Sequence, residues 1–112
     1  MDKSTYITIN GIRIANLISV SSSIEREYKT ENGKINAAIS SISVNLKRAL
    51  YSGAPTDGVN IRTLSNFVLK LHTPLHVSTF SGCEWVSFNE RIEENRIVED
   101  MRIASPSYSV AN

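Results

Sequence analysis

The stretch from Gly82 to Ala104 constrains the fold most, because it alternates with the two-residue period of half-buried strands. Its second limb places four residues on one side: Ile97, Glu99, Met101 and Ile103. The polar sequence Glu93-Glu94-Asn95 separates this limb from a first limb that carries Trp85. The stretch therefore predicts two strands joined by a turn.

Two Asn-Gly pairs predict further hairpins, because both central residues of the favoured two-residue turn need positive φ. Asn10-Gly11 lies between the β-branched runs Tyr6–Ile9 and Ile12–Ile14. Asn32-Gly33 ends the most charged segment of the chain, which follows a long predicted strand that begins at Leu17. We expect this charged segment to be the far end of a long projecting hairpin, with a mobile surface loop as the alternative.

The segment Ile35–Leu50 fits both the two-residue period of a strand and the 3.6-residue period of a helix. Its apolar residues alternate around Ile42, Val44 and Leu46, yet they also recur at helical spacing. Serine and β-branched residues are poor in helix interiors, so we predict a strand. On the preceding strand Ser19, Ser21 and Ser23 share one face, which we expect to be wet or to contact something polar.

One short α-helix is predicted from Asn60, as its N-cap, to Asn66, with Ile61, Leu64 and Val68 facing inward. Tyr51–Gly58 before it contains Gly and Pro and predicts a loop. Phe67–His72 and Leu75–Phe80 predict extended segments on either side of Pro74. We expect loosely held ends over 1–4 and 105–112.

The chain of 112 residues therefore predicts a single mainly β domain over 1–112. We expect an antiparallel β-sandwich or partly closed barrel of about seven strands, with one short α-helix and the long projecting hairpin.

Charge and cysteine content exclude several classes. Lys and Arg number 12 and Asp and Glu 11, a net charge of +1 that is mixed along the chain, so no basic footprint for nucleic acid is evident. One cysteine, Cys83, excludes an internal disulfide. No apolar run approaches the roughly 18 residues of a membrane span, and the first residues lack the apolar core of a signal peptide. We expect a soluble protein made in the cytoplasm.

Each possible metal-binding or catalytic residue also has a purely structural explanation. His72 and His76 have metal-ligand spacing for a helix, but Pro74 lies between them, so ordinary strand-end histidines are expected. Cys83 could be a nucleophile with either histidine as base, or a small buried side chain. We expect no metal, no cofactor and no catalytic residue.

Two clusters have similar alternatives. The acidic residues Glu93, Glu94, Glu99 and Asp100 could do acid-base work, but alternation and nearby arginines favour a solvated or interface face. The aromatic residues could stack bases, but basic residues do not interleave with them, so a core role is favoured. The aromatic residues concerned are Tyr51, Phe80, Trp85 and Phe88. The one adjacent basic pair is Lys47-Arg48.

The order of these elements resembles the tail-tube proteins of long-tailed bacteriophages and the inner-tube proteins of contractile injection particles. The elements that carry the resemblance are the hairpin around Asn10-Gly11, the charged hairpin from Ile24 to Val44, the loop and helix from Gly53 to Asn66, and the closing strand pair, Gly82-Cys83-Glu84-Trp85 with Ile97–Ile103.

The resemblance implies a structural virion-type protein and no enzyme. Such subunits form homo-oligomeric rings, commonly hexameric, which stack into a tube around a channel. It implies sheath, tape-measure and baseplate proteins as partners, no sequence-specific nucleic acid and no membrane anchor. It also implies assembly in the cytoplasm of a bacterial host and a final place in a virion or phage-tail-like particle. The implied ring-stacking residues are Glu25, Arg26, Glu27, Tyr28, Lys29, Glu31, Asn32, Gly33 and Lys34.

Alternative functions remain at this stage. One is an adaptor or completion protein of a phage tail or baseplate with the same core. Another is a small β-barrel module that binds nucleic acid or peptide.

Overall fold

The computed structural model describes residues 4–51 and 57–112. In these residues eight strands form one antiparallel sheet that does not close, and the helical content is one 3-10 turn. The elements are β1 (Tyr6–Ile9), β2 (Ile12–Arg13), β3 (Leu17–Glu31), β4 (Lys34–Tyr51), η1 (Ile61–Thr63), β5 (Phe67–His72), β6 (Val77–Glu93), β7 (Arg96–Ala104) and β8 (Ser107–Ala111).

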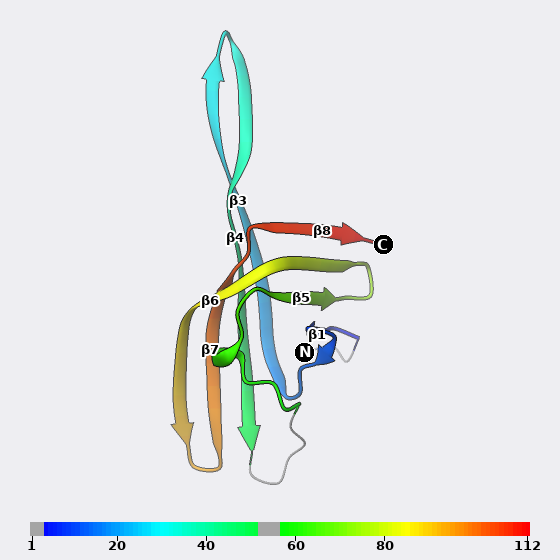
Figure 1. Cartoon of the computed structure of the whole chain (residues 1–112), viewed down its shortest axis with the longest axis vertical. Coiled ribbons are helices and arrows are strands. Elements are labelled where there is room, and N and C mark those ends of the chain that lie inside the picture. The colour runs from blue at the N-terminus through cyan, green and yellow to red at the C-terminus, as the bar shows by residue number, and fades with distance from the viewer. Residues whose placement is uncertain (1–3, 52–56) are drawn as a thin grey trace.

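β6 belongs to both halves of this sheet because it bends at Gly82, where φ is +65°. Val77–Cys83 pairs with β5 and Val77–Ser81 with β8, whereas Glu84–Glu93 pairs with β7. The first half therefore has the order β2-β1-β5-β6-β8 and the second the order β6-β7-β4-β3. Figure 1 shows the strands of the first half running across those of the second.

The hydrophobic core lies between these halves. Ile7, Phe67 and Leu69 come from the first half, and Val44 and Met101 from the second, and all are almost fully buried. Alternation supplies this arrangement, since each strand buries one face and leaves the other to solvent. The expected two-layered β architecture is confirmed, although it is built from one bent sheet.

Both Asn-Gly turns adopt the predicted backbone. Asn10 and Gly11 have φ of 51° and 83°, and Asn32 and Gly33 have φ of 50° and 76°. Asparagine and glycine tolerate this left-handed region better than other residues, so each pair sets the register of its hairpin. The predicted strand over Ile35–Leu50 is confirmed as part of β4.

The predicted helix differs from the structure. The helix predicted from Asn60 is the single turn η1, and the Asn60 side chain makes no capping hydrogen bond. Asn66, with φ of 49°, then redirects the chain into β5. Residues 52–56 of the expected loop Tyr51–Gly58 lie outside the described residues.

The C-terminal segment 105–112, expected to be loosely held, contains β8. Pairing with Val77–Ser81 satisfies an edge of β6 that would otherwise be open. Tyr108 stacks on Phe80 with ring centroids 6.0 Å apart. The hydroxyl of Ser105 lies 2.7 Å from the carbonyl oxygen of Ser81, at the start of this pairing. Of the expected N-terminal tail 1–4, only Ser4 is described.

Candidate assembly interface

The β3–β4 hairpin extends far beyond the core. The strands pair up to Glu31 and Lys34, while all residues from 25 to 41 are exposed. The molecule measures 62 × 29 × 23 Å, and the hairpin forms one end of its long axis (Figure 1). We call residues 25–41 the projecting hairpin.

The projecting hairpin has two different faces. Strand alternation and the register of β3 against β4 place Arg26, Tyr28, Thr30, Ile35, Ala37 and Ile39 on one face. This face continues the core side of the sheet, which lower down carries Val20, Val44 and Leu46. The opposite face carries Glu25, Glu27, Lys29, Glu31, Lys34 and Asn36. We call these the apolar face and the charged face.

The apolar face leaves large side chains in solvent. Tyr28 and Ile35 are each 71% exposed and Ile39 is 50% exposed. An isolated two-stranded hairpin is marginally stable in water, and exposed apolar patches of this kind mark interaction sites. The projecting hairpin is therefore a candidate interaction surface.

The structure places all nine sequence-predicted stacking residues on this hairpin. Arg26 and Tyr28 lie on the apolar face, most of the others lie on the charged face, and Asn32 and Gly33 form the tip. Sequence reasoning missed Ile35 and Ile39, although Ile35, Ala37 and Ile39 alternate in the way that predicts one apolar strand face.

Free strand edges form a second candidate surface. In the second half of the sheet, β3 is one edge and Glu84–Glu93 of β6 is the other, and neither has a further strand beside it among the described residues. These four strands alternate in direction, so the two edges run oppositely. Copies related by a rotation about an axis along the strands could therefore pair edge to edge in antiparallel fashion.

The outer face of the same four strands is polar. It carries the predicted row Ser19, Ser21 and Ser23, which is exposed as expected. Lys47 of β4 and Asp100 of β7 also lie on it, and their charged groups are 3.8 Å apart. A face of this composition suits contact with water.

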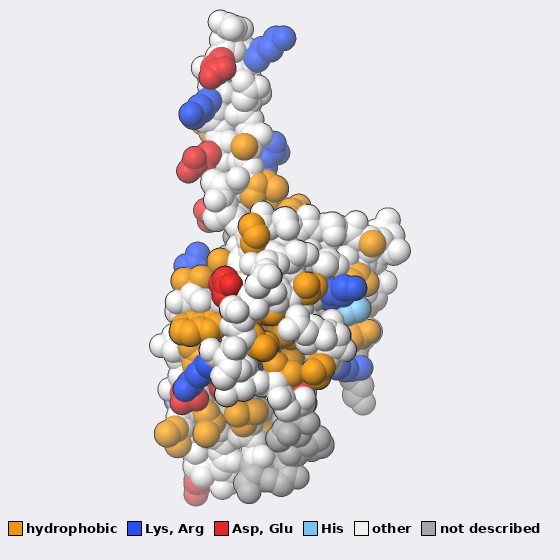
Figure 2. Space-filling model, viewed as in Figure 1, with side chains coloured by type: hydrophobic (Ala, Val, Ile, Leu, Met, Phe, Trp, Pro, Cys, Tyr) orange, Lys and Arg blue, Asp and Glu red, His pale blue; other side chains and the backbone are white. Residues whose placement is uncertain are grey.

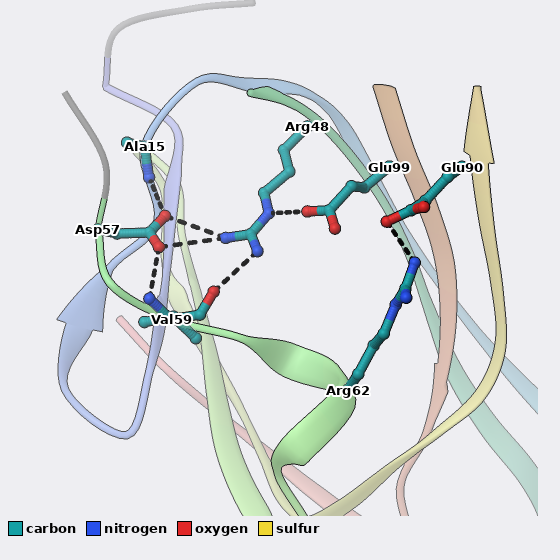
Figure 3. A network of polar contacts seen from close by, with 7 residues as sticks. All are labelled: Ala15, Arg48, Asp57, Val59, Arg62, Glu90 and Glu99. Atoms are coloured by element: carbon teal, nitrogen blue, oxygen red, sulfur yellow. Dashed lines mark hydrogen bonds and ion pairs between the residues drawn. The ribbon is translucent and has the colours of Figure 1, made fainter. Parts of the chain in front are cut away.

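A buried network beneath this sheet holds the connection before η1 in place (Figure 3). Arg48 Nε donates to Glu99 at 2.7 Å, and its two terminal nitrogens reach the Asp57 carboxylate and the carbonyl oxygen of Val59. Asp57 also accepts the backbone N–H groups of Ala15 and Val59, each at 2.8 Å. All three charged side chains are at most 8% exposed.

This network changes one sequence-based expectation. Glu99 was expected on a solvated or interface face, but it is buried opposite Arg48 in the β4–β7 register. Arg48 of the adjacent basic pair is buried, while Lys47 beside it is partly exposed. Alternation assigned Glu99 to the core side, but pairing with Arg48 from β4 could not be read from one strand alone.

The other acidic residues lie apart from this network. Glu93 accepts from Arg96 at 2.6 Å and from Arg91 at 3.1 Å, and these bonds, that to Arg96 above all, lower the pKa of its carboxyl group. The same bond to Glu93, together with one to Tyr51, raises the pKa of Arg96. This pairing at the β6–β7 turn is an exposed surface feature and no acid-base pair.

His72 and Cys83 contact other residues of the fold, and His76 lies between β5 and β6, where its backbone carbonyl oxygen accepts from the Thr73 hydroxyl at 3.1 Å. His72 stacks on Tyr6 with ring centroids 4.3 Å apart. Cys83 is buried, its thiol donates to the carbonyl oxygen of Phe80 at 3.3 Å, and burial raises its pKa. No group of three His, Cys, Asp or Glu side chains suited to a metal ion occurs in residues 4–51 and 57–112.

The aromatic residues are divided between core and surface. Phe80 is buried and Phe88 packs against the core, with the Arg62 guanidinium 4.1 Å from its ring centroid. Trp85 is 40% exposed and its indole N–H donates to the Arg62 carbonyl oxygen at 3.2 Å. Arg62 also pairs with Glu90, so this cluster anchors η1 to β6 (Figure 3).

Comparison with known proteins gives no match by sequence. No protein family model matches the chain, and no curated protein does. None of the helices in the described residues has the length and apolar character needed to cross a membrane.

Comparison by structure gives matches over nearly the whole chain. A chain of the sheath/tube terminator of PVC, an extracellular contractile injection system, has a TM-score of 0.67 at 10% identity, over 100% of this chain and 96% of that one. The anti-feeding prophage tube-terminating cap gives 0.68 at 9% identity, over 100% and 90%. Hcp1 from Flavobacterium johnsoniae gives 0.56 at 18% identity, over 95% and 93%.

These likenesses define the class of fold. The chain has the fold found in chains of the PVC sheath/tube terminator, the anti-feeding prophage tube-terminating cap and Hcp1, which confirms the resemblance drawn from its strand order. A chain of the PVC sheath–tube complex has the same fold, with a TM-score of 0.64 at 10% identity over 99% of this chain and 90% of that one. At such identities the likeness extends to the fold alone.

Proposed function

We propose that this protein is a structural subunit of a ring-stacked tail tube, in a phage tail or a phage-tail-like contractile particle. The observation that carries the proposal is the projecting hairpin, whose exposed apolar face has no partner in the described chain. The fold shared with tube and terminator chains supports the same role. No enzymatic activity is proposed.

The ring is proposed to close through the two opposite edges of the second half-sheet. β3 of one copy would pair with Glu84–Glu93 of the next, and the polar outer face would line the channel. Unpaired edges are a liability in a single molecule, and a closed ring removes them. Six copies per ring is the number that the resemblance implies.

The projecting hairpin is proposed to contact an adjacent ring through the nine stacking residues, which run from Glu25 to Lys34. The partners proposed beyond the ring are sheath, tape-measure and baseplate proteins, with assembly in the bacterial cytoplasm and a final place in the particle. Exposed ion pairs contribute only about 0–1 kcal/mol each, so the charged face would set register more than strength.

A shortened hairpin tests the proposal. Removing Glu27–Thr30 together with Ile35–Ala38 joins the Arg26–Ile39 pair directly to the Glu31–Lys34 pair. The deletion takes an even number of residues from each strand, so the alternation of faces and the Asn32-Gly33 turn are kept. We expect the core to unfold at an unchanged denaturant concentration, because the removed residues are all exposed.

The readout is electron microscopy of concentrated protein beside the unaltered chain. The unaltered chain should form rings and stacks, and the shortened chain should form rings that do not stack. A full-length protein that stays monomeric at every salt concentration refutes the proposal. Stacking that survives the deletion refutes the role of the hairpin.

A tube terminator or adaptor with one ring per particle is the second candidate. The specific observation in its favour is that the terminator and cap chains give TM-scores of 0.67 and 0.68. Copy number in a purified particle separates the two, because a tube subunit is abundant and a terminator is rare.

A further inference from the structure

A second apolar surface lies at the opposite end of the molecule from the projecting hairpin. An open recess of about 710 Å3 is lined there by Leu50, Tyr51, Ile92, Glu94, Arg96 and Ile97, among others. Ile92 is 80% exposed and Tyr51 40% exposed. Figure 2 shows hydrophobic side chains over the body, some of them near this lower end, whereas charged side chains follow the hairpin in the same view. We call this the lower recess.

Three apolar residues of the lower recess belong to the same side of the sheet as the apolar face of the hairpin, whereas Tyr51, Arg96 and Glu93 of the recess pair on the outer side. Leu50, Ile97 and Ile92 lie opposite one another in the strand register, on the side that carries Leu46 and Met101 higher up. The core-facing side of the second half of the sheet therefore extends beyond the hydrophobic core at both ends. At each end it leaves large apolar side chains that no described part of the chain covers.

The hairpin turns over between the body and its tip. In Figure 1 β3 lies on one side of β4 in the body and on the other side near the tip, although the two strands remain paired throughout. A bulge at Ser40, opposite the step from Glu25 to Arg26, lies where the hairpin leaves the body, and bulges increase the twist of a strand pair. The apolar face near the tip therefore points opposite to the lower recess.

Because of this half turn, the hairpin of one copy can overlap the lower end of the next copy. When one copy stands above another in the same orientation, the apolar face of the lower copy's hairpin meets the lower recess of the upper copy face to face. Without the turn, two identical faces would point the same way and could not meet. The contact joins different surfaces, so it continues from copy to copy instead of closing as a dimer.

The hairpin and the lower recess also carry complementary charges. Arg26 is the one charged residue on the apolar face, and it donates to the backbone oxygen of Ala37 at 3.3 Å without a carboxylate partner in the described chain. Glu94 at the rim of the recess is exposed and makes no ion pair with described residues. Tyr28 lies two residues beyond Arg26 on β3, and Ile92 of β6 lies two residues before Glu94, which is in the β6–β7 turn.

We propose that the lower recess is the receptor for the projecting hairpin of a second copy of this chain, with Arg26 opposite Glu94 and Tyr28 opposite Ile92. The inference rests on the proposed function, since it names the surface that the stacking hairpin binds. Its occupant is a copy of this same protein, bound through apolar burial with one charge pair at the edge.

Disulfide trapping tests this contact in the full-length protein. A variant with Tyr28→Cys and Ile92→Cys is assembled, oxidised mildly and run on a non-reducing gel. We expect a ladder of cross-linked multimers, because each chain joins one copy above and one below. The matched control is Lys29→Cys with Ile92→Cys, which moves the hairpin thiol to the charged face and should give no ladder. Cys83 remains in both variants because it is buried.

The outcomes separate this inference from the proposed function. Dimers without higher multimers, or a ladder that is as strong in the control, overturn the proposed contact between the hairpin and the lower recess. Stacked rings seen by microscopy with no cross-link also overturn it and leave the tube proposal standing. Absence of any rings or stacks of the unaltered chain at high concentration overturns both.

A charge reversal provides a second measurement that does not depend on cysteine chemistry. Arg26→Glu should raise the protein concentration needed for stacking by about tenfold, as expected for losing one charge pair at an interface. Glu94→Arg in the same chain should restore the original concentration. Two independent losses without rescue overturn the pairing of these residues.

Discussion

Replacing Arg48 with methionine should destabilise the fold severely, because it removes the partner of two buried carboxylates. The side chains of Glu99 and Asp57 are 8% and 6% exposed, so neither can be fully hydrated in its present place. Breaking a buried ion pair from one side costs about 3–5 kcal/mol. A domain of 112 residues has a total stability on the order of 5–15 kcal/mol, so this change removes a large share of it.

Urea unfolding measures this loss. With a slope of about 2 kcal/mol per molar urea, the midpoint should fall by about 2 M. Lys47→Met is the matched control one residue away, because Lys47 is partly exposed and its pair with Asp100 spans 3.8 Å. That variant should lose at most about 1 kcal/mol.

A double variant identifies the cause. In Arg48→Met with Glu99→Met, one unpaired carboxylate is gone, while Asp57 keeps the backbone donors of Ala15 and Val59. We expect this protein to be more stable than Arg48→Met alone. An Arg48→Met protein within about 1 kcal/mol of the original, or a double variant less stable than the single one, would refute the reasoning.

Two further predictions concern the bend in β6. Gly82→Ala should lower the free energy of unfolding by about 1–3 kcal/mol in urea, since φ is +65° and a Cβ would lie 3.0 Å from Pro106. The control Gly58→Ala, with φ of +73° and open space around it, should cost less. Equal losses would contradict the role of crowding at Gly82. Cys83 should react slowly with iodoacetamide at pH 8 in the folded protein and quickly in urea, because burial raises the pKa of its thiol. Its contribution to stability is complete below the ordinary thiol pKa and is lost as pH rises toward the raised folded value, and equal rates of alkylation would contradict the burial.

Local chemistry was sufficient to predict most of the strands. Alternation identified β7, and the two Asn-Gly pairs identified the hairpin turns, because these signals depend only on neighbouring residues. The same reasoning separated a strand from a helix over Ile35–Leu50, where β-branched and serine content outweighed helical spacing. These are features that a short segment determines by itself.

The features that were missed depend on distant residues. β8 forms because Val77–Ser81 offers an open edge and Phe80 offers a ring for Tyr108. The helix expected after Asn60 is reduced to η1 because β5 begins at Phe67, with Asn66 turned into positive φ. β5 is paired with β1 and β6, and β8 with Val77–Ser81, so each outcome depends on pairing with distant residues that propensity does not describe.

The candidate site was predicted in part. Charge density and Asn32-Gly33 predicted the projecting hairpin. The apolar row Ile35, Ala37 and Ile39 on its other face was not predicted, because the prediction used the charged residues alone. The lower recess could not be predicted at all, because Leu50, Ile92 and Ile97 come from three strands whose register only the fold determines.

The two proposed directions of assembly use different groups of one sheet. Lateral growth would use backbone N–H and C=O groups on the edges of β3 and β6, which are sequence-tolerant and fixed by strand direction. Axial growth would use the side chains that the same sheet exposes at its ends, such as Tyr28 and Ile92. Substitutions of these side chains can therefore abolish stacking while rings persist, since the edge hydrogen bonds do not depend on them. An even number of strands supplies opposite edges, and the turn of the hairpin supplies opposed faces, so both proposed contacts would repeat without end-to-end inversion of any copy.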